Sequence, residues 1–315
     1  MVKNFKAGDQ VVTFFILRKK ELKAKTESGE FYLNLELLDA SGRIFATLWR
    51  DAKQVYEKIE TGAVVKVKAA VIDYHGKPHL TINRVRLVRD DDDYDLSKLV
   101  AQVDADPEQL LEKLSDMIKR VTNSHLSNLL QIIFNDEEIS KQFAAAPGGK
   151  LWHHSYIGGL LEHTLNVTEI ALNCAALYPE INHDLLLSAG LLHDIGKIKT
   201  YTYQTLIEFT DEGRLLGHIV MGSQMVKEKI DKIKDFPPQL EKELLHLILS
   251  HQGKLEHASP VVPMTLEGLL LYFADEIDSK ANAFQRIKEK EGDQGWSRYV
   301  QLMNQYFYFG RDEKA

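Results

Sequence analysis

Cysteine is almost absent from this sequence, since Cys174 is the only one among 315 residues. A single cysteine excludes an internal disulfide and a metal site built from several thiolates. No apolar run reaches the ~18 residues that a membrane-spanning helix needs. The first ten residues, MVKNFKAGDQ, also lack the apolar stretch of a secretory signal peptide. We therefore expect a cytoplasmic protein that does not enter a membrane.

Charge is distributed unevenly along the chain, whose net charge is −7. Residues 1–89 hold 17 Lys/Arg and 10 Asp/Glu, a balance of +7, so the remaining residues, with 22 and 36, carry −14. A basic first part joined to an acidic second part indicates that the first part contacts an anionic partner. The alternative is that small domains drift in charge without a functional reason.

The first part of the chain has the alternating pattern of β-strands. Leu33, Leu35 and Leu37 alternate with polar positions, and the next segment repeats the pattern with Ile44 and Ala46. Five such strands are expected, at 11–20, 30–39, 43–49, 63–74 and 79–88, with a short helix at 51–61 and a turn at 75–78. Five strands with a helix between the third and fourth predict an OB-fold barrel.

Aromatic and basic side chains share the face opposite the expected barrel core. Arg43, Phe45 and Trp49 have the same parity on the third strand, and Tyr32 lies on the matching face of the second. Rings that stack on bases, together with cations that contact phosphates, are typical of proteins that bind single strands. Alternatively, Phe45 and Trp49 pack beneath the helix or against another domain.

Helical periodicity dominates after residue 106. We predict an OB-fold domain at 1–89, an extended acidic linker at 90–106 that includes the run DDDDYD, and a helical domain at 107–315. Asp106 followed by Pro107 predicts the start of the first helix. One exception is a β-hairpin expected within 200–215, with its turn at Asp-Glu-Gly.

Histidines and aspartates recur at positions where apolar helical segments would be buried. An unpaired imidazole or carboxylate is costly there, and convergence on divalent cations would remove the cost for all of them. The residues in question are His163, His193, Asp194, His218, His251 and Asp275. Imidazoles and carboxylates without thiolates suit Mn, Fe, Zn, Ni or Co.

A metal site of this kind predicts hydrolysis of a phosphate ester. Bound cations lower the pKa of water, and two cations together stabilise an in-line displacement at phosphorus. Lys197, one helical turn beyond His193, is a candidate for neutralising a phosphoryl oxygen. Alternatively, Lys197 is a solvated lysine at a helix end.

The order His163, His193-Asp194 and Asp275 resembles the H…HD…D signature of the HD-domain metal-dependent phosphohydrolases. His218 and His251 resemble the additional ligands of the members that hold two metals. The surrounding segments HHSYIGGLLEHT, LLHDIGK, FTDEGRLLGHIVMG and SPVVPMTLEGLLLYFADEIDSK, together with an N-terminal OB-fold, resemble the YhaM-type 3′-to-5′ exoribonucleases over nearly the whole chain.

The resemblance implies an all-α HD domain in which these six residues are metal ligands and Asp194 bridges two ions. The expected catalytic residues are Asp194 and, from its spacing to His193, Lys197. The resemblance also implies Mn²⁺ as the activator and single-stranded RNA, with DNA left open, as a substrate trimmed from its 3′ end to nucleoside monophosphates.

Where relatives often have His-His-Gly, this chain has His251-Gln252-Gly253. If the second histidine of the relatives binds metal, this difference predicts weaker metal occupancy or a changed metal preference. Gln252, which can donate or accept a hydrogen bond, is also a candidate for contacting phosphate or a metal ligand.

Three further residues are expected near the metals without contacting them. His153 and His154 are candidates for binding phosphate, or alternatively for fixing the turn before the helix that carries His163. Asp278 lies one turn after Asp275 on the same helical face, where it could orient a ligand.

Two alternative functions are weighed against the exoribonuclease. One is an HD-domain phosphohydrolase of small or cyclic nucleotides, which would not need a basic barrel. The other is a nucleic-acid-binding protein with an inactive HD domain. A homo-oligomer is left open by the sequence.

Overall fold

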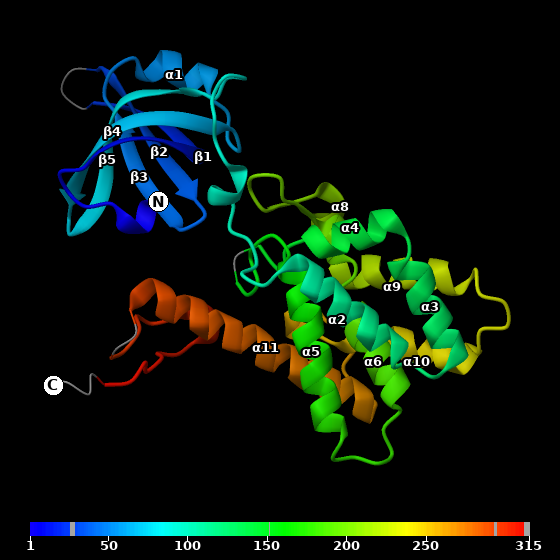
Figure 1. Ribbon diagram of the computed structural model, residues 1–315. Coiled ribbons are helices and arrows are strands. Elements are labelled where there is room, and N and C mark those ends of the chain that lie inside the picture. Colours follow the sequence, from blue (N-terminus) through cyan, green and yellow to red (C-terminus); the bar gives the residue numbers. More distant parts are fainter. Residues whose placement is uncertain (26–28, 151, 293–294, 312–315) are drawn as a thin grey trace. The chain divides into compact units, whose positions relative to one another are not determined.

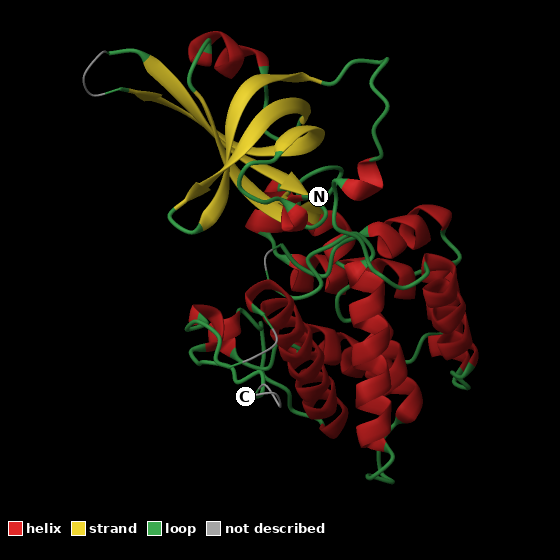
Figure 2. Cartoon of the chain, turned by 60° about the vertical axis from the view of Figure 1, so that its left-hand side comes forward, coloured by secondary structure: helices red, strands yellow, loops and turns green. Residues whose placement is uncertain are grey.

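The computed structural model describes residues 1–25, 29–150, 152–292 and 295–311. The chain divides into two compact units. The first comprises residues 1–102 and 202–208, and the second comprises 103–201 and 209–315. Figure 1 labels the helices and strands of each unit, and Figure 2 shows that strands dominate the first and helices the second.

The first unit is built on a closed five-stranded barrel. The strands are β1 (Gln10–Ala24), β2 (Phe31–Asp39), β3 (Gly42–Leu48), β4 (Val64–Tyr74) and β5 (Lys77–Leu87). Their order is β1-β2-β3-β5-β4, and β3 pairs in parallel with β5 while the other neighbours are antiparallel. β1 closes the barrel because its first half pairs with β4 and its second half with β2. Helix α1 (Ala52–Lys58) lies between β3 and β4 in the chain, so the predicted OB-fold is confirmed.

The alternation read in the sequence separates the barrel core from its surface. Leu33, Leu35, Leu37, Ile44 and Ala46 are all buried in one apolar cluster with residues from the other strands. Because side chains alternate along a strand, the intervening residues face outward. The predicted core of these two strands is therefore confirmed.

Asp90, Asp91, Asp93 and Asp95 of the acidic run are exposed, whereas Asp92 is not solvated, although the sequence predicted that it would be. The Asp92 side chain is only 4% exposed and pairs with Lys66 Nζ at 2.8 Å and Arg86 Nη1 at 2.5 Å. Leu99, further along, packs with Ile16 and Val64 of the barrel. Cations on β4 and β5 compensate the charge that the run alone would leave unbalanced.

The second unit contains ten helices among the described residues: α2 (Pro107–Lys119), α3 (Ser124–Phe134), α4 (Glu137–Ala145), α5 (Gly159–Ala175), α6 (His183–Leu192), α7 (Lys197–Thr200), α8 (Asp211–Leu215), α9 (His218–Ile230), α10 (Pro238–Ser250) and α11 (Leu266–Glu291). Asp106 caps α2 by accepting the Glu108 backbone N–H, with Pro107 in the first turn as predicted. α5 packs against both α6 and α11. None of the helices described is long and apolar enough to cross a bilayer.

The hairpin predicted at 200–215 is present but shorter than expected. β6 (Tyr201–Thr202) pairs with β7 (Glu208–Phe209). The predicted turn at Asp211-Glu212-Gly213 is wrong, because these residues begin α8, with the Thr210 hydroxyl accepting the Gly213 N–H. Within the first unit, Leu206 packs against the cluster of Ile16, Val64 and Leu99.

Candidate active site

Five helices of the second unit bring their polar residues to one buried point. His163 lies within α5, His193 and Asp194 follow the end of α6, His218 begins α9, His251 follows α10, and Asp275 lies within α11. α6 is buried along nearly its whole length, so its end projects into the interior. The six residues that the sequence singled out therefore come together, although 112 positions separate the first from the last.

Asp194 lies at the centre of this cluster. Its Oδ2 atom is 3.4 Å from Nε2 of His163 and 3.4 Å from Nε2 of His193. Its Oδ1 atom is 3.4 Å from Nε2 of His218 and 3.6 Å from Nε2 of His251. Each carboxylate oxygen thus faces two imidazoles, which is the arrangement of a carboxylate shared between two cation sites.

Three groups of side chains among the described residues have ligand atoms close enough to hold a cation, and two of them meet at Asp194 and His163, while the third is His153, His154 and His163. Of the two that meet, one consists of His163, His193 and Asp275, and the other of Asp194, His218 and His251, with the ligand atoms of each group within 4.8 Å of one another. In the first group, Asp275 Oδ1 is 3.2 Å from His163 Nε2. Two such groups side by side favour a pair of divalent cations.

The hydrogen bonds of the imidazoles fit cation binding. His193 Nδ1 donates to the Gly190 carbonyl at 2.7 Å, and His251 Nδ1 donates to the Ile248 carbonyl at 2.7 Å. These bonds leave a lone pair on each Nε2 directed at the cluster. Asp194 Oδ1 and the Nε2 atoms of His218 and His251 are buried without a hydrogen-bond partner. Such atoms are costly unless a cation satisfies them, so the residues present fit the predicted metal.

The electrostatics of the cluster point the same way. Burial lowers the pKa of His218 to about 3, which keeps the ring neutral and able to coordinate. Burial alone would raise the pKa of Asp194. Lys197 and His193 outweigh this effect and hold the pKa well below its ordinary value, so the carboxyl is ionised. Burial also opposes the charge on His163, yet hydrogen bonds to Asp194, Asp275 and Asp278 hold its pKa well above the ordinary value. His163 thus lies where positive charge, from a proton or a metal, is strongly favoured.

Lys197 is buried rather than solvated. Its Nζ atom lies 2.5 Å from Asp194 Oδ2, one helical turn away. Burial alone would lower the pKa of Lys197. Asp194 outweighs this effect and raises the pKa above its ordinary value, so the side chain is an ammonium. The alternative of a solvated lysine at a helix end is therefore wrong, and a fixed positive charge lies beside the cluster.

Asp278 fixes the orientation of His163. Its Oδ2 atom lies 2.6 Å from Nδ1 of His163 and 2.7 Å from Nε2 of His154, and its Oδ1 atom accepts from Asn166 Nδ2 at 3.0 Å. Burial raises the pKa of Asp278, but the two imidazoles lower it to well below its usual range. A carboxylate that accepts the Nδ1 proton directs the other ring nitrogen toward the metal.

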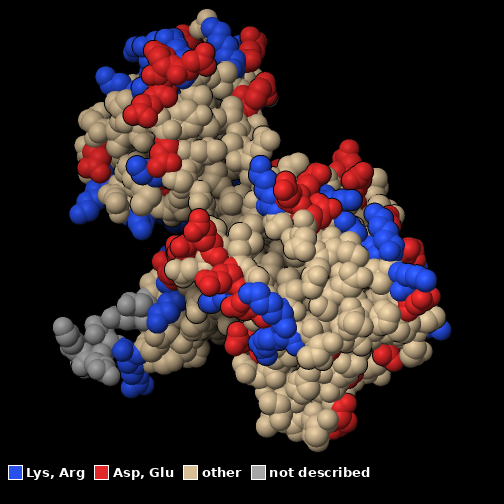
Figure 3. All heavy atoms as spheres, turned by 45° about the vertical axis from the view of Figure 1, so that its right-hand side comes forward, with Lys and Arg blue, Asp and Glu red and all other residues tan. Residues whose placement is uncertain are grey.

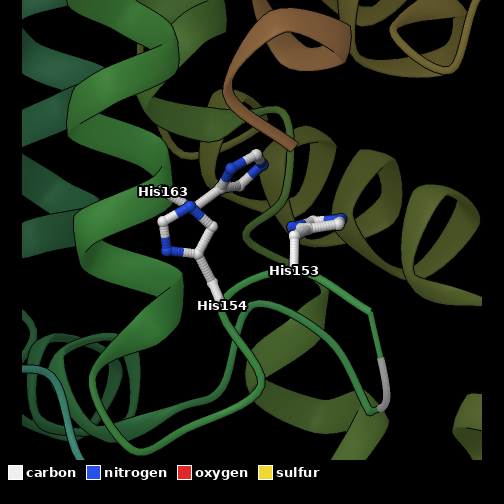
Figure 4. A group of neighbouring side chains, drawn as sticks. All are labelled: His153, His154 and His163. Atoms are coloured by element: carbon white, nitrogen blue, oxygen red, sulfur yellow. The ribbon is translucent and has the colours of Figure 1, made fainter. Parts of the chain in front are cut away.

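His153 and His154 lie in the loop before α5, with their rings beside that of His163 (Figure 4). His154 is held on both ring nitrogens, by Asp278 and, at 3.0 Å, by Glu162 Oε2. His153 differs, since its Nδ1 atom is buried without a partner and burial lowers its pKa well below the ordinary value. Only His153 of the pair therefore has a ring nitrogen available to a ligand.

Gln252, which stands where relatives often have a second histidine, is half-buried directly after His251. The predicted effect of this residue on metal binding stays a prediction. The sequence analysis missed the hydrogen bond from the Tyr156 hydroxyl to Glu162, the carboxylate that also contacts His154. The only signal for it was an acidic residue directly before His163 within an apolar helix.

The barrel carries a separate groove of about 460 Å³. Tyr32 and Trp49 lie in it with stacked rings whose centroids are 5.1 Å apart, and Phe45 also lines it. Arg43 does not line the groove, but it pairs at 3.2 Å with Glu36, which does. The groove also contains residues that the sequence analysis missed: Lys19, Tyr74 and His79. Their strands were predicted, but the curvature that brings the strand ends together was not.

An OB-fold joined to a helical unit with a buried His/Asp cluster defines a metal-dependent phosphohydrolase of the HD class, and residues 160–280 match the HD domain family. Over 299 residues the chain is 33% identical to the 3′-5′ exoribonuclease YhaM of Oceanobacillus iheyensis, covering 93% of this chain and 92% of the relative. The chain therefore belongs to the YhaM family of 3′-5′ exoribonucleases.

Solved structures similar to this chain match about a third of it. The OB domain of Ta0387 from Thermoplasma acidophilum covers 30% of the chain and 90% of its own length, with 14% identity and a TM-score of 0.25. The second OB-fold domain of replication protein A from Methanococcus maripaludis covers 30% and 97%, with 13% identity and a TM-score of 0.24.

Proposed function

We propose that this chain is a metal-dependent exonuclease that removes nucleoside monophosphates from the 3′ end of single-stranded RNA in the cytoplasm. The observation that carries the proposal is the position of Asp194, whose two oxygens each face two buried imidazoles. The activity in the name of the Oceanobacillus relative supports the same reaction and its direction.

Each residue of the cluster has a role in the proposal. His163, His193 and Asp275 would hold one cation, His218 and His251 would hold another, and Asp194 would be shared between them. When bound, such cations, which we propose to be Mn²⁺, would lower the pKa of water and stabilise charge on the phosphoryl group. Nitrogen and oxygen ligands without thiolates are compatible with that metal.

The chain's own groups position the substrate and its charge. The buried Lys197 ammonium places a permanent positive charge where negative charge develops on a phosphate oxygen. The free Nδ1 atom of His153 is placed to contact the phosphate or leaving group. Asp278 and His154 do not contact substrate and instead hold His163 in its orientation.

The barrel groove is proposed to bind the RNA chain upstream of its 3′ end. Stacking of bases on aromatic rings such as Trp49, Tyr32 and Phe45 contributes about 1–3 kcal/mol per base. Lys19 in the groove, and Arg43 at its margin, are the proposed phosphate contacts.

Digestion of a 20-nucleotide RNA labelled at its 5′ end, with Mn²⁺ added or chelated, tests the proposal. We expect a ladder that shortens from the 3′ end, mononucleotide products and no reaction with chelator. The Asp194→Asn variant should be inactive, whereas Asp231→Asn, at an exposed carboxylate that ends α9, should act like wild type. Internal cleavage, or faster hydrolysis of free or cyclic nucleotides than of RNA, would contradict the proposal. A matched DNA strand reports the sugar preference.

A further inference from the structure

The C-terminal residues form an irregular hairpin with two different faces. Segments 295–300 and 305–310 run antiparallel, joined by the bridges Trp296–Tyr308 and Val300–Gln305. Ser297 N–H donates to the Phe307 carbonyl at 2.8 Å, which holds the two segments in register. From residue 295 to residue 298 adjacent side chains therefore point to opposite sides. The pairing then shifts by one residue before the Val300–Gln305 bridge, and the Tyr299 ring lies against the Tyr306 ring.

The inner face of the hairpin is anchored to α11. The Phe284 ring on α11 lies 5.1 Å from the Phe307 ring and 5.5 Å from the Phe309 ring, both at steep angles. Phe309 is buried. In Figure 1 the C-terminal segment follows α11 at the end of the chain. The hairpin is therefore packed against the helix that precedes it.

The same helix carries residues of the metal cluster. Asp275 precedes Phe284 by nine residues on α11, which corresponds to about 14 Å along the helix axis at ~1.5 Å per residue. The hairpin is thus held at a fixed distance from the cluster by one continuous helix.

The outer face is aromatic and exposed. Trp296 is 70% exposed and Tyr306 is 59% exposed, and Tyr299 and Tyr308 are nearly half exposed. The rings lie in pairs, Trp296 with Tyr308 at 5.0 Å and Tyr299 with Tyr306 at 5.1 Å. The exposed large apolar residues described in this hairpin are all Tyr or Trp, and none is aliphatic.

The charge of this segment is opposite to that of the unit that carries it. Residues 295–311 include Arg298 and Arg311 but no Asp or Glu, although residues 90–315 carry −14 overall. Arg298 is exposed and forms no ion pair with the residues that the structure describes. Aromatic rings interleaved with unpaired cations and polar amides fit an anionic ligand that has flat faces.

We propose that the outer face of this hairpin is a second binding platform for single-stranded RNA, on which bases stack against Trp296, Tyr308 and Tyr306 and Arg298 contacts a phosphate. The inference rests on the proposed function, because it takes that substrate as the ligand. Self-association is the competing outcome of the test below, because Tyr, Trp and Arg are also the residues enriched where proteins contact one another.

Equilibrium binding tests the platform independently of catalysis. Anisotropy of a fluorescein-labelled 20-nucleotide RNA is measured with full-length protein in EDTA, so that no hydrolysis occurs. The double variant Trp296→Ala/Tyr308→Ala should bind at least about tenfold more weakly, because each stacking ring contributes about 1–3 kcal/mol. Trp296→Phe/Tyr308→Phe should retain most of the affinity. Tyr178→Ala, at an exposed ring elsewhere in the helical unit, should bind like wild type.

Two further measurements make the result decisive. Mn²⁺-dependent hydrolysis of bis-p-nitrophenyl phosphate should be unchanged in the double variant, which excludes misfolding of the metal cluster. Unchanged RNA affinity overturns the platform, and unchanged affinity with a smaller sedimentation coefficient assigns the face to self-association instead. Failure of wild-type protein to digest RNA would overturn the proposed function, while the binding comparison would still decide the platform.

Discussion

At the scale of single residues, Asp278 offers the sharpest test of how the cluster is held. Its carboxylate accepts hydrogen bonds from both His163 and His154, so Asp278→Asn leaves the shape but removes the charge. Loss of such a supporting carboxylate typically lowers metal affinity about 10- to 100-fold. We expect the Mn²⁺ concentration for half-maximal activity to rise by that factor while activity at saturating Mn²⁺ is largely restored. A metal titration of hydrolysis measures both.

The matched control for Asp278 is Glu289→Gln, which removes an exposed carboxylate from the same helix. It should leave the metal titration unchanged. If Asp278→Asn lowers activity equally at all Mn²⁺ concentrations, Asp278 does not act through the metal, and the argument from its hydrogen bonds is wrong.

The cluster could be predicted from the sequence because its residues interrupt apolar helices, where a polar side chain needs a reason to be buried. Which of them would be neighbours came from the family resemblance rather than from spacing. The position of Asp278 on the face of Asp275 was readable from helical periodicity. The contacts of Tyr156 and Glu162 were not, because they depend on the path of the irregular loop before α5.

At the scale of elements, Gly196 sets the distance between two segments of the cluster. A Cβ atom at Gly196 would lie 2.0 Å from the His218 carbonyl oxygen and 2.6 Å from the Gly222 nitrogen. Gly196→Ala must therefore push α9 away from the start of α7. Overpacking of this kind costs about 1–3 kcal/mol or more, and we expect the free energy of unfolding to fall by that amount. Activity should also fall, because His218 begins α9 and would move with it. Urea unfolding and RNA digestion measure the two effects.

Gly222→Ala is the comparison for that contact. Its Cβ atom would lie 3.1 Å from the Gly196 nitrogen and 3.5 Å from Ile195, so a shift of a few tenths of an ångström suffices. The variant should lose less stability than Gly196→Ala. Equal losses would mean that helix propensity or another local effect, rather than the close approach of the two backbones, controls stability here.

The ion pairs of Asp92 predict a pH-dependent stability of the barrel. Hydrogen bonds from Arg86 and Lys66 lower the pKa of Asp92 well below its ordinary value. A carboxyl with a lowered pKa in the folded state stabilises above its unfolded pKa of about 3.9 and loses that contribution as the pH falls below it. Asp92→Asn should therefore speed amide hydrogen exchange of β4 and β5 at neutral pH. The difference from wild type should shrink below about pH 4.

Asp91→Asn is the matched control for Asp92, because Asp91 is exposed in the same run. It should leave exchange of both strands unchanged at every pH. A difference between Asp92→Asn and wild type that persists undiminished in acid would show that the pairs with Lys66 and Arg86 do not stabilise the barrel.

The positions of the five strands could be predicted from alternation, because the barrel core needs one face of every strand, whereas their pairing order came only with the OB-fold that they indicated. The chain between β6 and β7 was harder to predict. A sequence Thr-Asp-Glu-Gly is compatible with both a turn and a capped helix start, and here Thr210 caps a helix whose Gly213 lies against the Thr200 backbone. Likewise, Asp92 looked solvated because its partners lie on strands distant in sequence.

At the scale of the whole molecule, the two parts of the chain differ in sign of charge, yet neither sign forms a continuous patch on the face drawn in Figure 3. Lys and Arg lie beside Asp and Glu over the helical unit, with broad uncharged areas between them. The net charge of each part therefore does not predict where RNA binds. The groove on the barrel and the His/Asp cluster indicate the proposed binding positions instead.

If the barrel groove binds RNA and the metal cluster hydrolyses it, the two steps can be changed independently. Trp49→Ala removes one of the two stacked rings of the groove, and a stacking ring contributes about 1–3 kcal/mol. The KM for a 20-nucleotide RNA should therefore rise about tenfold or more while kcat is unchanged. Hydrolysis of bis-p-nitrophenyl phosphate should not change, because that ester carries no nucleobase to stack on Trp49. Val12→Ala, at an exposed barrel residue outside the groove, should match wild type in both assays.

Salt provides an independent check on the same separation. Phosphate contacts release counterions, so KM for the RNA should rise steeply with NaCl, whereas hydrolysis of the small ester should respond weakly. In Trp49→Ala the salt slope should remain, because the ring carries no charge, and only the absolute KM should shift. A Trp49→Ala variant that loses kcat on RNA and on the small ester alike would assign Trp49 to the chemistry of the metal cluster and contradict this prediction.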